Sequence, residues 1–213
     1  MSRSARPRWR RRKDDRPAEI VAAALESFAE RGFAATRLDD IATRAGVTRG
    51  TLYLYFPSKE ELFKAVIRQR VVPVIAHVEE MIAAHSGPTI DLLTKLILSF
   101  PETLLASRAS AIPKLVIAEA RNFPELAQFY LDEVIRRGRR AMTAVIQRGM
   151  ARGEFRAVDR DHIFFCVMAP VLLAALWQHS LGLYDSKGLD SRALCRAHVD
   201  VLLNGLLKQS DAR

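Results

Sequence analysis

Apolar residues recur at helical spacing along almost the whole chain, and this periodicity limits the fold more than any other feature. In the segment before Gly32 they would form one helix face, made of Ile20, Val21, Ala24, Leu25 and Phe28. Glycine and proline are sparse, at 10 and 9 of 213 residues, and strand signals are absent. The sequence therefore predicts an all-α protein.

Helix boundary signals are densest between residues 36 and 58. Thr36 and Asp39 have the spacing of a capping box, which predicts a short helix over Leu38–Ala45 with Asp39 as a capping residue. Gly46 then permits the tight turn that a short connection between two helices requires.

A second short helix is predicted over Arg49–Tyr55, with Thr48 as its cap. Ser58 and Glu61 form a further capping box, which begins a third helix. Two short helices joined by a glycine turn are typical of a helix-turn-helix, whose second helix lies in the major groove of DNA. We therefore expect such a motif between about Leu38 and Phe56.

The charge of the chain is uneven, and its positive excess lies in the same region. Residues 1–70 hold 16 Lys and Arg against 9 Asp and Glu, whereas residues 71–213 hold 17 against 15. A basic segment attracts polyanions, although membrane lipids or solubility would explain a basic patch equally well. The patch supports DNA binding only together with the helix-turn-helix.

The second short helix would present a polar surface that suits base edges and phosphates. Its outward residues are Arg49, Gly50, Thr51, Tyr53 and Tyr55. An arginine can read guanine with two hydrogen bonds, and a threonine can offer a methyl group or a hydroxyl to a base. Gly50 would let the backbone come close, and tyrosine hydroxyls and the ammonium of Lys59 suit phosphate oxygens.

The residues of this region carry a specific resemblance. The stretch ALESFAERGFAATRLDDIATRAGVTRGTLYLYFPSKEELFKAV at Ala24–Val66, about a fifth of the chain, strongly resembles the N-terminal DNA-binding domain of TetR-family repressors. The resemblance implies base reading by Arg49, Gly50 and Thr51. It also implies phosphate contacts by Tyr53, Tyr55, Lys59 and Thr36. Asp39 aligns with a position that reads a base in some members, but we expect it to cap its helix.

The residues predicted to contact DNA are Thr36, Arg37, Arg44, Thr48, Arg49, Gly50, Thr51, Tyr53, Tyr55 and Lys59. Other roles stay open for some of them. Tyr53 and Tyr55 could pack in the core, and Arg37 and Arg44 could be solvated surface charges.

Three domains are expected along the chain. Residues 1–15 would form a disordered basic arm, which is either an inert tail or a DNA contact, and the first helix would begin near Asp15–Pro17. Residues 16–67 would form the DNA-binding domain. Residues 68–213 would form a domain that binds an effector and dimerises.

The helices expected downstream are longer than those of the helix-turn-helix. The helix that begins after Ser58 would run to about Ala84 with a kink at Pro73. The later ones are expected at about Thr89–Phe100, Glu102–Ser107, Ile112–Asn122, Pro124–Arg152, Asp159–Leu181 and Ser191–Gln209. In the TetR family the last two long helices form a four-helix bundle across a two-fold axis, which implies a homodimer and a palindromic operator. Residues 113–155 also resemble the subgroup of regulators related to AefR.

An effector pocket would lie among the helices of the larger domain. Its candidate residues are Phe100, Leu104, Phe129, Met142, Met168, Trp177, Gln178 and His179. Each could instead be ordinary core, because aromatic residues and methionines at helical spacing usually are. Arg136–Arg140 could bind an anionic effector or form a solvated face.

Other functional classes find little support in the sequence. The five histidines show no metal-ligand spacing, so we expect no metal and no cofactor. No phosphate loop or nucleophile motif indicates an enzyme. No apolar run is long enough for a membrane span, and we expect a cytoplasmic protein.

The sequence thus predicts a ligand-responsive transcriptional regulator. We expect it to be a repressor that a small, largely apolar molecule releases from DNA. A transcriptional activator or a non-sensing architectural DNA-binding protein is the alternative.

Overall fold

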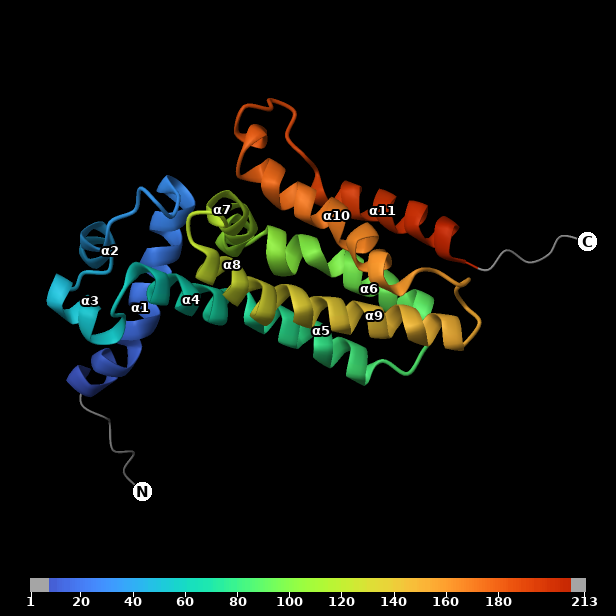
Figure 1. Cartoon of the computed structure of the whole chain (residues 1–213), viewed down its shortest axis with the longest axis horizontal. Helices are drawn as coiled ribbons and strands as arrows, with labels where there is room; N and C mark the ends of the chain where they lie inside the picture. Colours follow the sequence, from blue (N-terminus) through green and yellow to red (C-terminus); the bar gives the residue numbers. More distant parts are fainter. Residues whose placement is uncertain (1–7, 208–213) are drawn as a thin grey trace, which may run out of the picture. The chain divides into compact units, whose positions relative to one another are not determined.

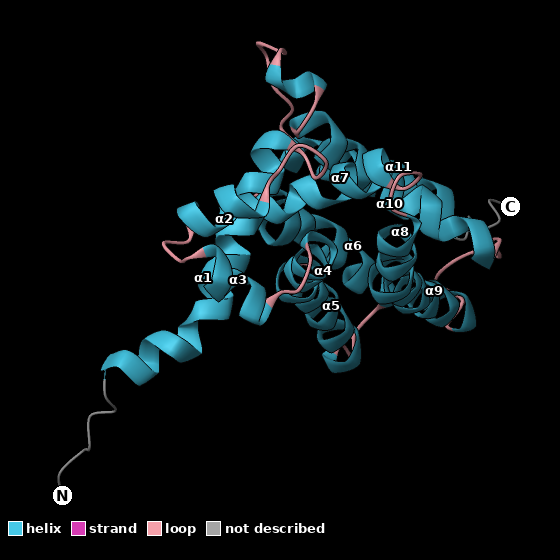
Figure 2. Cartoon of the chain, turned by 60° about the vertical axis from the view of Figure 1, so that its left-hand side comes forward, coloured by secondary structure: helices cyan, strands magenta, loops and turns pink. Residues whose placement is uncertain are grey.

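The computed structural model describes residues 8–207, with side chains for residues 16–160 and 162–207. No strand occurs among the residues that it describes, and helices account for almost all regular structure (Figure 2). The prediction of an all-α protein is confirmed. Two compact units divide the chain, one of residues 1–69 and one of residues 70–213.

The described part of the first unit, from residue 8 on, contains four helices. They are α1 (Arg8–Arg31), α2 (Leu38–Arg44), α3 (Arg49–Tyr55) and α4 (Lys59–Arg70), whose last residue is counted with the second unit (Figure 1). A cluster of three rings packs α1 and α4 together, because Phe28, Phe33 and Phe63 are fully buried with centroids 5.2–5.4 Å apart. The two contacts of Phe63 are edge-to-face, and such contacts stabilise a core beyond the area that they bury.

The first helix begins earlier than expected. It starts at Arg8 and runs through Pro17, so residues 8–15 of the predicted arm are helical. A proline lacks one N–H donor, but it does not have to end a helix when the turns on both sides continue. Residues 1–7 of that arm lie outside the described residues.

The second unit contains the remaining helices. They are α5 (Val72–Ala84), α6 (Thr89–Phe100), η1 (Pro101–Leu105), η2 (Arg108–Ala111), α7 (Ile112–Glu119), α8 (Pro124–Tyr130), η3 (Leu131–Ile135), α9 (Arg136–Ala151), α10 (Arg160–Gln178), η4 (Leu181–Leu183) and α11 (Ser191–Leu206). Within this unit α6 packs against both α9 and α11, and α10 packs against the same two helices (Figure 1).

Several long predicted helices are interrupted. The expected helix to Ala84 is α4 and α5, separated at Val71, because Pro73 lies in the first turn of α5 and cannot donate to the preceding turn. The expected helix Pro124–Arg152 is α8, the π-helical turn η3 and α9. The expected helix Glu102–Ser107 is the π-helical turn η1.

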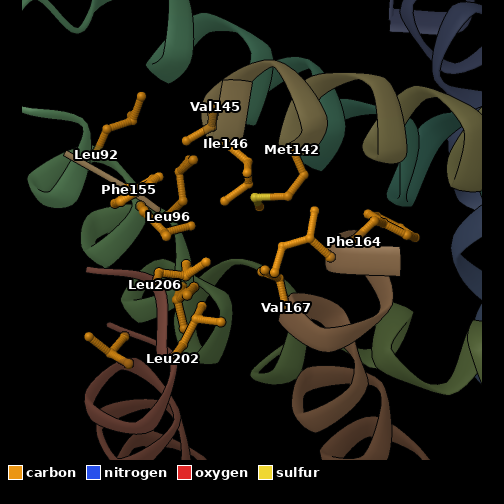
Figure 3. Packing of buried hydrophobic residues seen from close by; sticks show 14 of the residues in the cluster. Leu92, Leu96, Met142, Val145, Ile146, Phe155, Phe164, Val167, Leu202 and Leu206 are labelled. Carbon is orange, nitrogen blue, oxygen red and sulfur yellow. The ribbon is translucent and has the colours of Figure 1, made fainter. Parts of the chain in front are cut away.

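The core of the second unit is an apolar cluster drawn from α6, α9, α10 and α11. Leu92, Leu96, Val145, Ile146 and Val167 are fully buried in it (Figure 3). Phe155, which follows α9, joins the cluster, and its ring lies directly over the backbone of Gly149. A side-chain carbon built on Gly149 would approach the ring to 2.1 Å, so only glycine fits at that position.

A carboxylate distant in sequence caps α6. Glu154 accepts hydrogen bonds from the backbone N–H groups of Thr89 and Ile90, at 2.6 and 3.1 Å, and from the Thr89 hydroxyl. These groups are among the orphan donors that every helix start leaves unpaired. Burial alone raises the pKa of Glu154, but these bonds and the nearby Arg152 outweigh it and lower that pKa below its ordinary value.

Candidate nucleic-acid interface

The turn between α2 and α3 has the predicted geometry. Gly46 adopts a positive φ of 65°, a backbone conformation that favours glycine. Its N–H and that of Val47 donate to Thr43 and Ala42, which closes the end of α2. Thr48 caps α3 as expected, because its hydroxyl oxygen accepts from the N–H of Thr51 at 3.1 Å. The turn and cap predicted from the sequence are confirmed.

The outer face of α3 carries most of the residues predicted to contact bases. Arg49 and Gly50 are exposed and Thr51 is half-buried. Tyr53 is 39% exposed, and Leu54 beside it is 83% exposed. Leu54 was not among the predicted contacts, although its position four residues after Gly50 and three after Thr51 places it on the same side of α3. A leucine there can contact the methyl group of thymine.

Thr36 does not form the predicted capping box. Its side chain is 2% exposed, and its hydroxyl donates toward the carbonyl oxygens of Ser27 and Gly32 near the end of α1. The residue before α2 is Arg37, which makes no side-chain capping bond. The local Thr-x-x-Asp spacing was misleading, because tertiary contacts with α1 satisfy the threonine instead. A phosphate contact at Thr36 would have to use its backbone.

Asp39 does not cap α2 either, so that prediction is wrong. Its Oδ2 accepts from Nη1 of Arg49 at 3.1 Å, which links α2 to the start of α3. Its Oδ1 is buried and makes no hydrogen bond with the residues that the structure describes. Arg49 also approaches the Tyr53 hydroxyl at 3.4 Å and lies 5.5 Å from the centre of that ring. Tyr53 and Asp39 together raise the pKa of Arg49.

Lys59 has an internal role that the sequence did not reveal. Its ammonium donates to the backbone carbonyls of Phe33, Ala34 and Thr36, at 2.9, 3.0 and 3.1 Å. It also lies 4.7 Å from the centre of the Phe33 ring. An ammonium has three N–H donors, so these contacts use all of them. In this geometry Lys59 holds the loop between α1 and α2 in place, and its ammonium has no N–H donor left for a phosphate.

Arg44 and Arg37 differ in their surroundings. Arg44 makes a two-pronged ion pair with Glu30 of α1, one bond of which is 2.9 Å long. Arg37 is exposed next to α2. Tyr55 is half-buried at the end of α3. The structure therefore gathers Thr48, Arg49, Gly50, Thr51 and Tyr53 at the start and outer face of α3, where Arg49 pairs with Asp39. Thr36, Arg44 and Lys59 instead bond to α1 or to the loop that follows it.

The predicted effector residues are dispersed through the second unit. Met142 and Phe100 are buried, and Met142 belongs to the apolar core, against which Met168 also packs. Leu104 and Phe129 are half-buried, and Gln178 is exposed. Met142 and Met168 are therefore better explained as ordinary core residues than as effector contacts.

The end of α10 has a more polar environment. Nε2 of His179 lies 2.7 Å from the Ser110 hydroxyl, and Lys114 donates to the His179 carbonyl. Burial lowers the pKa of His179, and Lys114 and Arg108 lower it further. The indole Nε1 of Trp177 is buried and makes no hydrogen bond within the described part of the chain. A buried donor of this kind suits an acceptor on a ligand.

A shallow hollow of about 460 Å³ lies along α9. Arg136, Arg139, Arg140, Thr143, Ala144 and Gln147 line it. Arg136 pairs with Asp132, and the guanidinium of Arg139 lies 5.8 Å from the ring of Phe165. The hollow contains none of the eight residues predicted to bind an effector.

Exposed apolar residues follow the outer sides of α10 and α11. Leu173 is 58% exposed and Val201 is 71% exposed, and Phe165 and Leu172 are exposed on α10 as well. Exposed apolar side chains that gather on two neighbouring helices are a common feature of protein interfaces. No helix among the described residues is long and apolar enough to cross a membrane. No group of three or more potential metal ligands occurs among them.

Comparisons with known proteins match both units. Residues 20–66 match the sequence model of bacterial regulatory proteins of the tetR family, and residues 85–182 match that of the tetracyclin repressor-like C-terminal domain. The chain is 28% identical over 191 residues to the HTH-type transcriptional repressor KstR2 of Mycolicibacterium smegmatis, covering 88% of this chain and 89% of that protein.

Solved structures share the fold. FadR from Bacillus subtilis, in complex with stearoyl-CoA, aligns with a TM-score of 0.70 and 21% identity over 88% of this chain and 98% of that one. A transcriptional regulator from Saccharomonospora viridis, in complex with choline, aligns with a TM-score of 0.77 and 20% identity over 92% of this chain and 100% of that one.

Proposed function

The chain belongs to the TetR family of DNA-binding transcriptional regulators, and from this premise we propose that it is a dimeric repressor that reads a palindromic operator through α3. The observation that carries this proposal is the outer face of α3. A capped helix presents an arginine, a glycine and a threonine in succession at its exposed start. This combination suits direct reading of bases in the major groove.

The residues around α3 have two kinds of role, contacts with DNA and contacts within the first unit. Tyr53 and the half-buried Tyr55 contact phosphates through their hydroxyls. The exposed Arg37, beside α2, contacts a phosphate through its guanidinium. Lys59 and Arg44 act instead by holding the loop and α2 against α1. The exposed Leu54 adds an apolar contact.

The exposed apolar surface of α10 and α11 supports the dimer. Two copies that bury Leu173 and Val201 against each other would remove these side chains from water, which is the main driving force of such association. A two-fold axis pairs the same surface with itself. It also gives the two copies of α3 symmetric half-sites on DNA, so the operator would be palindromic.

Selection of binding sites from random DNA by the full chain tests this proposal. We expect the enriched sequence to be palindromic, since a dimer contacts two half-sites. Arg49→Ala should lose about 5- to 150-fold of the preference at one base pair in each half-site, because a bidentate arginine contact contributes about 1–3 kcal/mol of discrimination. Arg37→Ala is the control, since a lost phosphate contact weakens binding to all sequences alike. An Arg49→Ala chain with an unchanged preference would refute base reading by this residue.

We further propose that the effector is a molecule with a long apolar part, bound in the second unit. FadR, which shares this fold, was solved with stearoyl-CoA, and the buried donor of Trp177 could bond to a polar group of such a ligand. Stearoyl-CoA should raise the midpoint of thermal unfolding, since a ligand at about 100 times its Kd stabilises the folded state by about 2.7 kcal/mol. Free CoA is the control without the acyl chain. An equal shift with free CoA, or a shift with choline alone, would contradict an apolar effector.

A further inference from the structure

The guanidinium of Arg49 is held on two sides. Its Nη1 donates to Asp39 at 3.1 Å, and its Nη2 lies 3.4 Å from the Tyr53 hydroxyl. Asp39 comes from α2, whereas Arg49 and Tyr53 lie one turn apart on α3. The side chain predicted to read a base is thus fixed by groups from both helices of the motif.

We propose that Asp39 is a positioning residue for DNA recognition, which holds Arg49 in the orientation that reads its base. This inference rests on the proposed function, because it assigns a role within the same recognition surface. Asp39 neither caps α2 nor reads a base itself. One of its carboxylate oxygens is buried, and the other already accepts from Arg49.

The donors of the guanidinium allow this role. The guanidinium of an arginine has five N–H donors, and Asp39 and Tyr53 use only two of them. The remaining donors can still bond to O6 and N7 of guanine. An arginine on an exposed helix samples many rotamers, and holding it in place reduces the entropy that is lost when it binds. A site that is preorganised in this way discriminates more sharply between the right and the wrong base.

The ion pair between Arg49 and Asp39 contributes little to the stability of the folded chain. The side chains of Arg49 and Asp39 are 63% and 43% exposed, and exposed ion pairs contribute little to folding. We therefore expect Asp39 variants to fold normally, so that their DNA binding can be measured.

The neighbouring Asp40 provides a matched control. It carries the same charge on the same helix, but it pairs with Arg31 of α1 at 2.8 Å. Asp39→Asn and Asp40→Asn each remove one negative charge near the DNA, so both should strengthen binding to all sequences by a similar factor. Only Asp39→Asn should change how Arg49 is oriented.

The experiment compares the wild type, Asp39→Asn, Asp40→Asn, Arg49→Ala and the double variant of Asp39 and Arg49. The probes are the selected operator and the same operator altered at the base pair whose preference Arg49→Ala loses. We expect Asp39→Asn to lose about fivefold or more of the discrimination at that base pair, which is within the range of couplings between side chains in contact. The double variant should lose no more than Arg49→Ala alone, and Asp40→Asn should keep the full preference.

Two results would overturn the inference while leaving the proposed function in place. One is an Asp39→Asn chain that discriminates as well as the wild type. The other is a loss of preference at a different base pair that adds to the effect of Arg49→Ala, which would make Asp39 a base-reading residue. A wild type that enriches no sequence at all would instead overturn the proposed function, and the inference with it.

Discussion

Replacing Gly149 with alanine is expected to destabilise the second unit by about 3 kcal/mol, at the upper end of the usual cost of overpacking a core. The added carbon would lie 2.1 Å from Cδ2 of Phe155 and 2.8 Å from its Cγ, so the ring would have to move as a whole. Phe155 is 3% exposed within the apolar core and has little space to move into. Unfolding in urea, followed by circular dichroism, measures the effect.

Gly138 on the same helix is the control for this prediction. A side-chain carbon there would meet only Phe164, at 3.9 Å, which is an ordinary contact. Gly138→Ala should be neutral or stabilising by up to about 1 kcal/mol, because alanine favours helices over glycine. In a chain that also carries Phe155→Ala, Gly149→Ala should cost little. If Gly149→Ala and Gly138→Ala had the same effect, the close packing of Phe155 on Gly149 would be refuted.

Replacing Lys59 with alanine is expected to destabilise the first unit by about 2–3 kcal/mol, which is typical of the loss of charged hydrogen bonds. The substitution leaves the carbonyls of Phe33, Ala34 and Thr36 without their donor and removes a cation from the end of α1. Thermal unfolding of the full chain, followed by the near-ultraviolet signal of its aromatic residues, measures the loss.

The salt dependence of DNA binding separates this role of Lys59 from a phosphate contact. A residue that contacts one phosphate contributes about one unit to the slope of log affinity against log salt. We expect the slope of the Lys59→Ala chain to stay unchanged while its stability falls. Lys95→Ala, an exposed lysine on α6, controls for the loss of one positive charge. A reduced slope with unchanged stability would restore the phosphate contact that the sequence predicts.

The sequence predicts those parts of the fold that depend on neighbouring residues. Thr48, three residues before Thr51, caps α3, and Gly46 makes the turn before it. Both interactions lie within a few residues of the chain, where residue type and spacing decide the geometry. The bounds of α2 and α3 could therefore be predicted almost to the residue.

The parts that were missed depend on contacts between distant segments. Lys59 meets carbonyls 23 to 26 residues earlier, and Arg44 meets Glu30 14 residues earlier. Thr36 and Asp39 have the spacing of a capping box, but their partners lie on α1 and α3. Local patterns cannot show which of two available partners a polar side chain takes. For the same reason, the sequence does not separate core methionines from residues that line a pocket.

The cap that Glu154 places on α6 links the stability of the second unit to pH. The carboxyl has a lower pKa in the folded chain than its ordinary value of about 4.5 in an unfolded one. The folded chain therefore binds protons less readily at this site, and the cap contributes fully above that ordinary value. Its contribution declines as the pH falls through the lowered pKa that Glu154 has in the folded chain. At neutral pH a single ionised side chain thus does for α6 what helices usually obtain from the residue that precedes them.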